Sequence, residues 1–227
     1  MSQKITQNLK TLRKQISKKR KPNQTIKLVA VTKTRSAEQI CTAIGAGVSS
    51  IGENRVQEAE KKFPQIATID TVEKRLIGQL QSNKIKKAIK LFDTIDSVDS
   101  TRLANKISKA SATIKKKQRV LIQVNTSNEN TKGGFEKENI DEMLLCFNFE
   151  NIKIEGLMTV GPTEPDKHKR KKAFMKLRKT FSKINAKLPS DKKMTEISMG
   201  MSGDFLIGVE CGSTMVRVGT AIFGERE

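Results

Sequence analysis

The chain has 227 residues, a length that fits one larger domain or at most two small ones. It carries 44 lysines and arginines against 24 acidic residues, a formal charge of +20, which raises nucleic acid or an anionic membrane as partners. Three cysteines without metal-ligand spacing exclude a disulfide framework or a zinc site, and the lack of a signal segment or a membrane-spanning apolar run predicts a cytoplasmic protein.

The predicted elements begin with an amphipathic helix and then alternate between strands and helices. Ile5, Leu9, Leu12 and Ile16 follow helical spacing, and Pro22 ends that segment. Strands are predicted, in chain order, at residues 27–32, 48–52, 75–78, 94–98, 119–125, 153–159, 195–199 and 215–218. Amphipathic helices are predicted between them, at residues 37–46, 55–63, 83–92, 101–112, 137–147, 167–188 and 204–210.

Strands that alternate with helices in this way predict an α/β fold. Several of the strands are nearly continuous apolar runs, as expected when both faces of a parallel sheet are covered. The count fits a compact, single-domain (β/α)8 barrel of the TIM type, and an open doubly wound sheet of the same elements is the alternative. Since no linker rich in Pro, Gly or Ser divides the chain, residues 1–227 are expected to form one domain.

The positive charge is spread along the chain in short clusters, at residues 18–21, 115–117 and 169–172. These clusters fall at the ends of predicted elements and on helices in different parts of the chain. They carry no interleaved aromatic residues on which bases would stack. We therefore expect neither a nucleic acid nor a membrane as partner. A basic nucleic-acid-binding protein stays as the competing class, which a salt-dependent gel shift would reveal.

Lys33 directly follows the first predicted strand, the apolar run at residues 27–32. An amine at the end of a buried strand is held on a rigid element and is partly desolvated, which favours its neutral, nucleophilic form. This is what a Schiff base to a cofactor aldehyde requires. The alternative is a lysine that only marks where the strand meets solvent.

The last two strands are followed by groups that suit an anion. Ser198 and Ser202 lie in a glycine-containing strand-to-helix turn, where backbone N–H groups can form an anion site. Arg217 stands inside an apolar strand and must have an acceptor, and Gly219 and Thr220 follow it. In barrels, the loops after strands seven and eight commonly bind phosphate. An amine that faces such a site suggests pyridoxal 5′-phosphate (PLP), which carries both an aldehyde and a phosphate.

Other strand ends are less specific. Asn54 follows the second predicted strand and either caps the next helix or faces a ligand. Ser82 follows the third and is likewise a plausible helix cap. Asn125 and Met158 stand at the ends of the fifth and sixth predicted strands.

Seven segments, in order along the chain, match one known family: residues 28–34, 52–58, 77–84, 120–125, 156–158, 198–202 and 212–224. They include Leu-Val-Ala-Val-Thr-Lys-Thr around Lys33 and Gly-Glu-Asn-Arg-Val-Gln-Glu after the second strand. Through them the chain resembles the pyridoxal phosphate homeostasis proteins of the YggS/PROSC type over nearly its whole length. A match to any one segment would be weak support for the family, whereas matches to all seven in order are very specific.

The resemblance implies a barrel like the N-terminal domain of alanine racemase, with PLP held as an internal aldimine on Lys33. It implies that Asn54 lines the pocket and that Arg217 faces the pyridine nitrogen. The residues expected to hold the phosphate are Ser198, Ser202, Gly219 and Thr220. Three further residues of the matching segments complete the expected cofactor-binding set: Met158, Met199 and Gly200.

The resemblance also implies an intracellular role in PLP homeostasis, as a carrier or buffer, with PLP-dependent apoenzymes as recipients. It implies a monomer, or at most a weak dimer. Arg217 is a permanent donor and would leave the pyridine nitrogen unprotonated, which weakens the cofactor as an electron sink. The chain has no tyrosine to act as a racemase base. We therefore expect a binding protein without catalytic residues. A racemase-like enzyme of weak activity is the alternative.

Two positions depart from the family pattern. The family usually has tyrosine where this chain has Arg55, and an aromatic-histidine pair where this chain has Lys74 and Arg75. A role for that histidine is therefore in doubt in this protein, whereas Lys33 and the expected phosphate site are unaffected.

Overall fold

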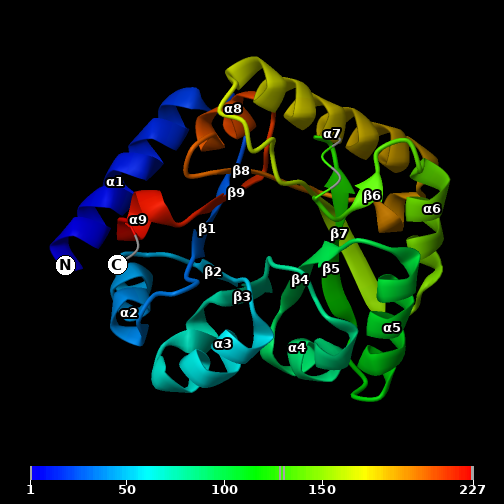
Figure 1. The fold of residues 1–227 in the computed structure, drawn as a ribbon, viewed down its shortest axis with the longest axis horizontal. Coiled ribbons are helices and arrows are strands. Elements are labelled where there is room, and N and C mark those ends of the chain that lie inside the picture. The colour runs from blue at the N-terminus through cyan, green and yellow to red at the C-terminus, as the bar shows by residue number, and fades with distance from the viewer. Residues whose placement is uncertain (1, 128, 130, 226–227) are drawn as a thin grey trace.

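The strands of the protein close into a barrel, and the helices lie around its outside (Figure 1). The computed structural model describes residues 2–127, 129 and 131–225. Around the ring the strands follow in the order β4-β3-β2-β1-β9-β8-β7-β5, and β4 pairs with β5 to close it. All of these pairings are parallel. The predicted barrel is confirmed, and the open doubly wound sheet is excluded.

The element bounds follow the predicted ones closely. The strands are β1 (Lys27–Val31), β2 (Ser50–Glu53), β3 (Glu73–Leu76), β4 (Thr94–Val98), β5 (Gln118–Asn125), β6 (Phe135–Glu136), β7 (Ile152–Met158), β8 (Glu196–Met201) and β9 (Met215–Val218). The helices are α1 (Ser2–Lys19), α2 (Ala37–Gly45), α3 (Val56–Lys62), α4 (Ile85–Leu91), α5 (Thr101–Ala112), α6 (Ile140–Leu145), α7 (Lys167–Lys187), α8 (Phe205–Glu210) and α9 (Thr220–Phe223). The short elements β6 and α9 were not predicted, because neither is long enough to produce a periodic pattern.

Helix starts and the core follow from local sequence. Ser36 caps α2 in a reciprocal capping box with Gln39, and Asp166 accepts two backbone N–H bonds at the start of α7. The apolar face of α1 is buried, and in Figure 1 this helix lies beside α2, α8 and α9. The main hydrophobic core therefore forms where the outer helices cover the strands. No helix within the described residues combines the length and apolarity needed to cross a membrane.

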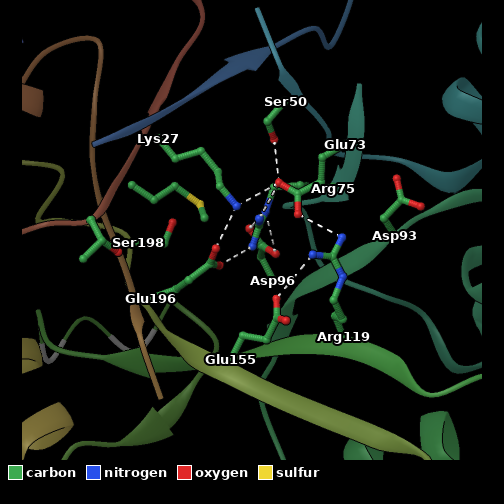
Figure 2. A network of polar contacts seen from close by, with 12 residues as sticks. Lys27, Ser50, Glu73, Arg75, Asp93, Asp96, Arg119, Glu155, Glu196 and Ser198 are labelled. Carbon is green, nitrogen blue, oxygen red and sulfur yellow. Dashed lines mark hydrogen bonds and ion pairs between the residues drawn. The ribbon is translucent and has the colours of Figure 1, made fainter. Parts of the chain in front are cut away.

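The interior of the barrel, in contrast, holds a network of charged side chains (Figure 2). Arg75 is fully buried at its centre. Its guanidinium donates to Asp96 at 2.9 Å, to Glu73 at 2.8 Å and to Glu196 at 2.8 Å. Arg75 stands at one of the positions that depart from the family pattern, and here it joins strands β3, β4 and β8 through its three partners.

Further ion pairs extend this network across the amino end of the barrel. Lys27 bridges Glu73 and Glu196 at 3.1 and 2.8 Å, and Arg119 contacts Glu73 at 2.9 Å. Burial by itself would raise the pKa of Glu73, but Arg75 and Lys27 outweigh it and lower that pKa to about 2. We call this set the basal ion network; its members are Lys27, Glu73, Arg75, Asp96, Arg119, Glu155 and Glu196.

Candidate functional site

A cavity of about 210 Å³ lies at the carboxyl ends of β1, β8 and β9. Several of the residues predicted from sequence line it together, although they come from opposite ends of the chain: Lys33, Ser202, Arg217, Gly219 and Thr220. The remaining lining residues are Val31, Arg35, Met201 and Gly203. The parallel barrel makes this possible, because it brings the carboxyl ends of strands that are distant in sequence to one rim.

Lys33 lies in the turn that directly follows β1, and it is half-buried. The next residue, Thr34, has a φ of 63°, in the left-handed region that β-branched residues rarely adopt. The N–H of Thr34 donates to Glu58 at 2.5 Å, and the carbonyl of Thr32 accepts from Lys62 at 2.8 Å. The backbone on both sides of Lys33 is therefore bonded to α3.

Arg217 is buried in β9 with its guanidinium against the cavity. It donates to Ser198 Oγ at 2.6 Å and to the Thr159 carbonyl at 2.7 Å, which confirms that it has acceptors. Among the described residues no carboxylate forms an ion pair with it. Burial lowers its pKa to about 10, partly opposed by Asp96, so the guanidinium stays charged at neutral pH. A ligand atom that meets it in the cavity has to be an acceptor.

The other wall of the cavity is built from the turn into α9 and from Ser202. The Oγ of Ser202 accepts from the N–H of Gly219 at 3.1 Å and from that of Ala221 at 3.4 Å. A Cβ added to Gly219 would lie 3.3 Å from both Cβ and O of Val31, so the chain approaches β1 too closely for a comfortable side chain. Backbone N–H groups and hydroxyls thus gather where sequence predicted a phosphate site.

Four of the predicted residues are not among those that line the cavity. Ser198 is buried, and its Oγ accepts a hydrogen bond from Arg217. Met158, on β7, is the register partner of Ser198 on β8 and is also buried. Met199 belongs to the hydrophobic core between barrel and helices. Gly200 has a φ of 103°, and a Cβ there would lie 2.9 Å from Phe205 Cα. Of these four, Ser198 supports the cavity directly, through its bond to Arg217.

Asn54 lines a different cavity, of about 550 Å³, beside the ends of β2 and β3. Its neighbours there include Arg55, Gln79 and Lys84. Arg55, not Asn54, is the N-cap residue of α3, and it forms no side-chain cap. Ser82 does not cap α4 either, since Lys84 occupies that position. The capping interpretation of Asn54 and Ser82 is therefore wrong.

Sequence reasoning missed Arg35, which also lines the cavity. Its guanidinium donates to the carbonyl of Gly224 at 2.5 Å and to that of Glu225 at 3.1 Å, and lies 5.7 Å from the ring centre of Phe223. It thereby ties the end of α9 to the turn after β1. In a chain with 44 lysines and arginines, nothing in the sequence distinguishes this arginine from the other basic residues.

The groups around the cavity fit PLP by their chemistry. An amine stands on one side, hydroxyl and backbone donors gather at the turn into α9, and the guanidinium of Arg217 lines the cavity with no carboxylate partner among the described residues. Those are partners for an aldehyde, a phosphate and a pyridine nitrogen respectively.

Comparison with known proteins agrees with this fold. The family model described as the alanine racemase N-terminal domain matches residues 2–227. The chain is 34% identical over 229 residues to a pyridoxal phosphate homeostasis protein of Pasteurella multocida, covering 100% of this chain and 98% of that one. It is 38% identical over 202 residues to the protein of the same name from Aquifex aeolicus, covering 88% and 87%.

Solved structures are similar over the same length. A structure of PipY from Synechococcus elongatus with PLP bound has a TM-score of 0.86 and 32% identity, covering 97% of this chain and 100% of that one. A protein from Bifidobacterium adolescentis, described as unknown, reaches 0.93 with 37% identity, covering 98% and 95%. Alanine racemase of Clostridium difficile, at 19% identity and 0.77, covers 97% and 57% and shares the fold. From its near full-length similarity to these relatives, the chain belongs to the pyridoxal phosphate homeostasis protein family, with the fold of the alanine racemase N-terminal domain.

Proposed function

We propose that this protein binds PLP in the cavity at the carboxyl end of the barrel and serves as a carrier or buffer of the cofactor. The observation that carries the proposal is the convergence of Lys33, Arg217 and the turn at Gly219 on one cavity. The family relatives named for PLP homeostasis and the PLP-bound PipY structure support the choice of ligand.

Each side chain has a role in this proposal. Lys33 would hold PLP through its aldehyde as a Schiff base, whose formation releases one water and which hydrolysis would reverse. Ser202 and the N–H groups at the start of α9 hold the phosphate. Arg217 donates a hydrogen bond toward the pyridine nitrogen and keeps that atom unprotonated.

We propose binding rather than turnover. Among the described residues that line the cavity there is no carboxylate, imidazole or phenol, so Lys33 is the single candidate there for moving a proton at a substrate carbon. The chain contains no tyrosine at all. We propose further that PLP-dependent apoenzymes receive the cofactor from this protein. We propose that the chain acts as a monomer.

Absorbance titration tests the binding proposal. Adding PLP to the protein should produce a saturable visible band, and Lys33→Ala should not produce it. Lys87→Ala is the matched control, because Lys87 is an exposed lysine paired with Glu60 on the outside of the barrel. An unchanged band in Lys33→Ala would remove Lys33 from the proposal.

Chiral analysis tests the absence of turnover. L-Alanine and other L-amino acids that are incubated for a long time with the PLP-loaded protein should remain the L-enantiomer, with at most trace racemisation. Racemisation at ordinary enzyme rates, on the order of one per second or faster, would overturn the carrier proposal in favour of an enzyme.

A further inference from the structure

Lys62, the last residue of α3, is buried, which is an unusual place for a lysine. Its ammonium donates to the Thr32 carbonyl, to Glu53 Oε1 and to Glu58 Oε1, each at 2.8 Å. An ammonium has three N–H donors, so each of them has its own acceptor. This arrangement is separate from the basal ion network at the other end of the barrel.

The partners of Lys62 are also partly or fully withdrawn from water. The Glu53 side chain is 0% exposed, and its Oε1 additionally accepts from Thr32 Oγ1 at 2.7 Å. Its Oε2 has no hydrogen-bond partner within the described residues. Burying such a group costs desolvation that a single ion pair does not reliably recover, so stability alone is a weak reason for the arrangement.

The contacts of this cluster converge on the turn that carries Lys33. Thr32, on one side, gives its carbonyl to Lys62 and its hydroxyl to Glu53. Thr34, on the other side, donates its N–H to Glu58, and it has the left-handed φ of 63° that a threonine rarely adopts. The turn therefore holds an unfavourable backbone conformation that the bond to Glu58 helps to maintain.

We propose that Lys62, Glu53 and Glu58 are positioning residues for Lys33. They fix the backbone at Thr32 and Thr34, and so present the Lys33 amine to the cavity in one orientation before PLP arrives. The inference rests on the proposed function, since it concerns the same amine. A group that is already oriented loses less conformational freedom on binding. In metal sites, residues that orient the ligands from behind are worth on the order of tenfold in affinity, and we expect an effect of similar size here.

Glu58→Ala tests the proposal, with Glu60→Ala as its control. Both glutamates lie on α3 and accept from a lysine, but Glu60 pairs with Lys87, away from Lys33. We expect Glu58→Ala to bind PLP about tenfold more weakly, and borohydride reduction to fix a smaller share of label on Lys33 and more on other lysines. Glu60→Ala should match wild type in both measurements.

Glu58→Gln separates orientation from charge. The amide oxygen of glutamine still accepts from the Thr34 N–H, so this variant should restore most of the affinity and most of the labelling at Lys33. A general loss of stability would instead shift the melting temperature and leave the distribution of label unchanged. Equal PLP affinity and equal Lys33 labelling in folded Glu58→Ala and wild type would overturn the proposal.

Hydrogen exchange of the wild-type chain provides a test that needs no stable variant. Thr34 is an exposed residue, and its N–H is bonded to Glu58. Its amide should exchange at least about tenfold more slowly than an unbonded amide of an exposed loop. Free exchange at Thr34 would overturn the positioning proposal while leaving PLP binding intact, whereas wild type without any Lys33 label would overturn the proposed function itself.

Discussion

The two buried arginines of the barrel, Arg75 toward the amino end and Arg217 toward the carboxyl end, are held in opposite ways. At the amino end the basal ion network pairs Arg75 with three carboxylates and Lys27 with two (Figure 2). At the carboxyl end the buried guanidinium of Arg217 bonds a hydroxyl and a carbonyl. The carboxylates around Arg75 tie strands β3, β4 and β8 together, whereas the charge of Arg217, which bonds neutral groups, stays available to a ligand. Substitutions at the two ends should therefore change different quantities.

The largest effect is expected from Arg75→Met. Asp96 is 0% exposed and would lose the ion pair at 2.9 Å, so the folded state should lose about 3–5 kcal/mol in free energy of unfolding. Urea unfolding of the apoprotein measures this loss. Arg119→Met is the comparison within the same network, because Arg119 is 36% exposed and should cost no more than about 1 kcal/mol. Equal losses in the two variants would contradict a network centred on Arg75.

The basal ion network at the amino end of the barrel should also make stability depend on pH. The pKa of Glu73 is about 2 in the folded protein and 4.5 as its ordinary value, since Arg75 and Lys27 outweigh the effect of burial. A carboxyl with a lowered folded pKa stabilises the fold above its unfolded pKa, and that contribution is lost as pH falls toward the folded value. Unfolding free energies should therefore fall between about pH 4.5 and 2, and the fall should be shallower in Arg75→Met. Parallel curves for the two proteins would argue against this origin.

A smaller effect, of another kind, is expected from Arg217→Met at the carboxyl end. Because Arg217 has no carboxylate partner within the described residues, its loss should cost the apoprotein no more than about 2 kcal/mol of stability. PLP affinity should fall by about tenfold, since the donor toward the pyridine nitrogen is gone. Urea unfolding without PLP measures the loss of stability, and an absorbance titration with PLP measures the loss of affinity. A stability loss as large as that of Arg75→Met, with affinity intact, would erase the distinction between the two ends.

The smallest effect is expected from Ser202→Ala. The serine contributes one hydroxyl beside the N–H groups of Gly219 and Ala221, and one hydrogen bond is worth about 1 kcal/mol, or about fivefold in affinity. The loss should be seen with PLP and not with pyridoxal, which lacks the phosphate. Equal weakening for both compounds would place Ser202 away from the phosphate.

Sequence patterns predicted the barrel well because strand runs and helix periodicity are local. Lys33, Arg217 and Gly219 could be assigned to one site because parallel strands send their carboxyl ends to one rim. The basal ion network could not be predicted in this way. Arg75 reaches Glu196, 121 positions away, and this partner is set by closure of the barrel. Without that contact, Arg75 is only a residue that departs from the family pattern.

Lys62, at the carboxyl end of the barrel, is a second residue whose contacts could not be predicted from sequence. In sequence it is one more lysine on an amphipathic helix, and only the packing of α3 against the turn after β1 buries it. Met199 shows the reverse case, since it lies in a matching segment but packs into the hydrophobic core. Position along a strand predicts which end of the barrel a residue occupies, and neighbours from other strands decide what it contacts.

One measurement tests the central claim most directly: borohydride reduction of the wild-type protein with PLP, followed by intact mass and peptide mapping. We expect a single equivalent of fixed PLP, located on the peptide that contains Lys33, and no specific label in Lys33→Ala. Label spread evenly over the many lysines of this basic chain, or an undiminished single label in Lys33→Ala, would contradict the assignment of the carboxyl end of the barrel as the PLP site.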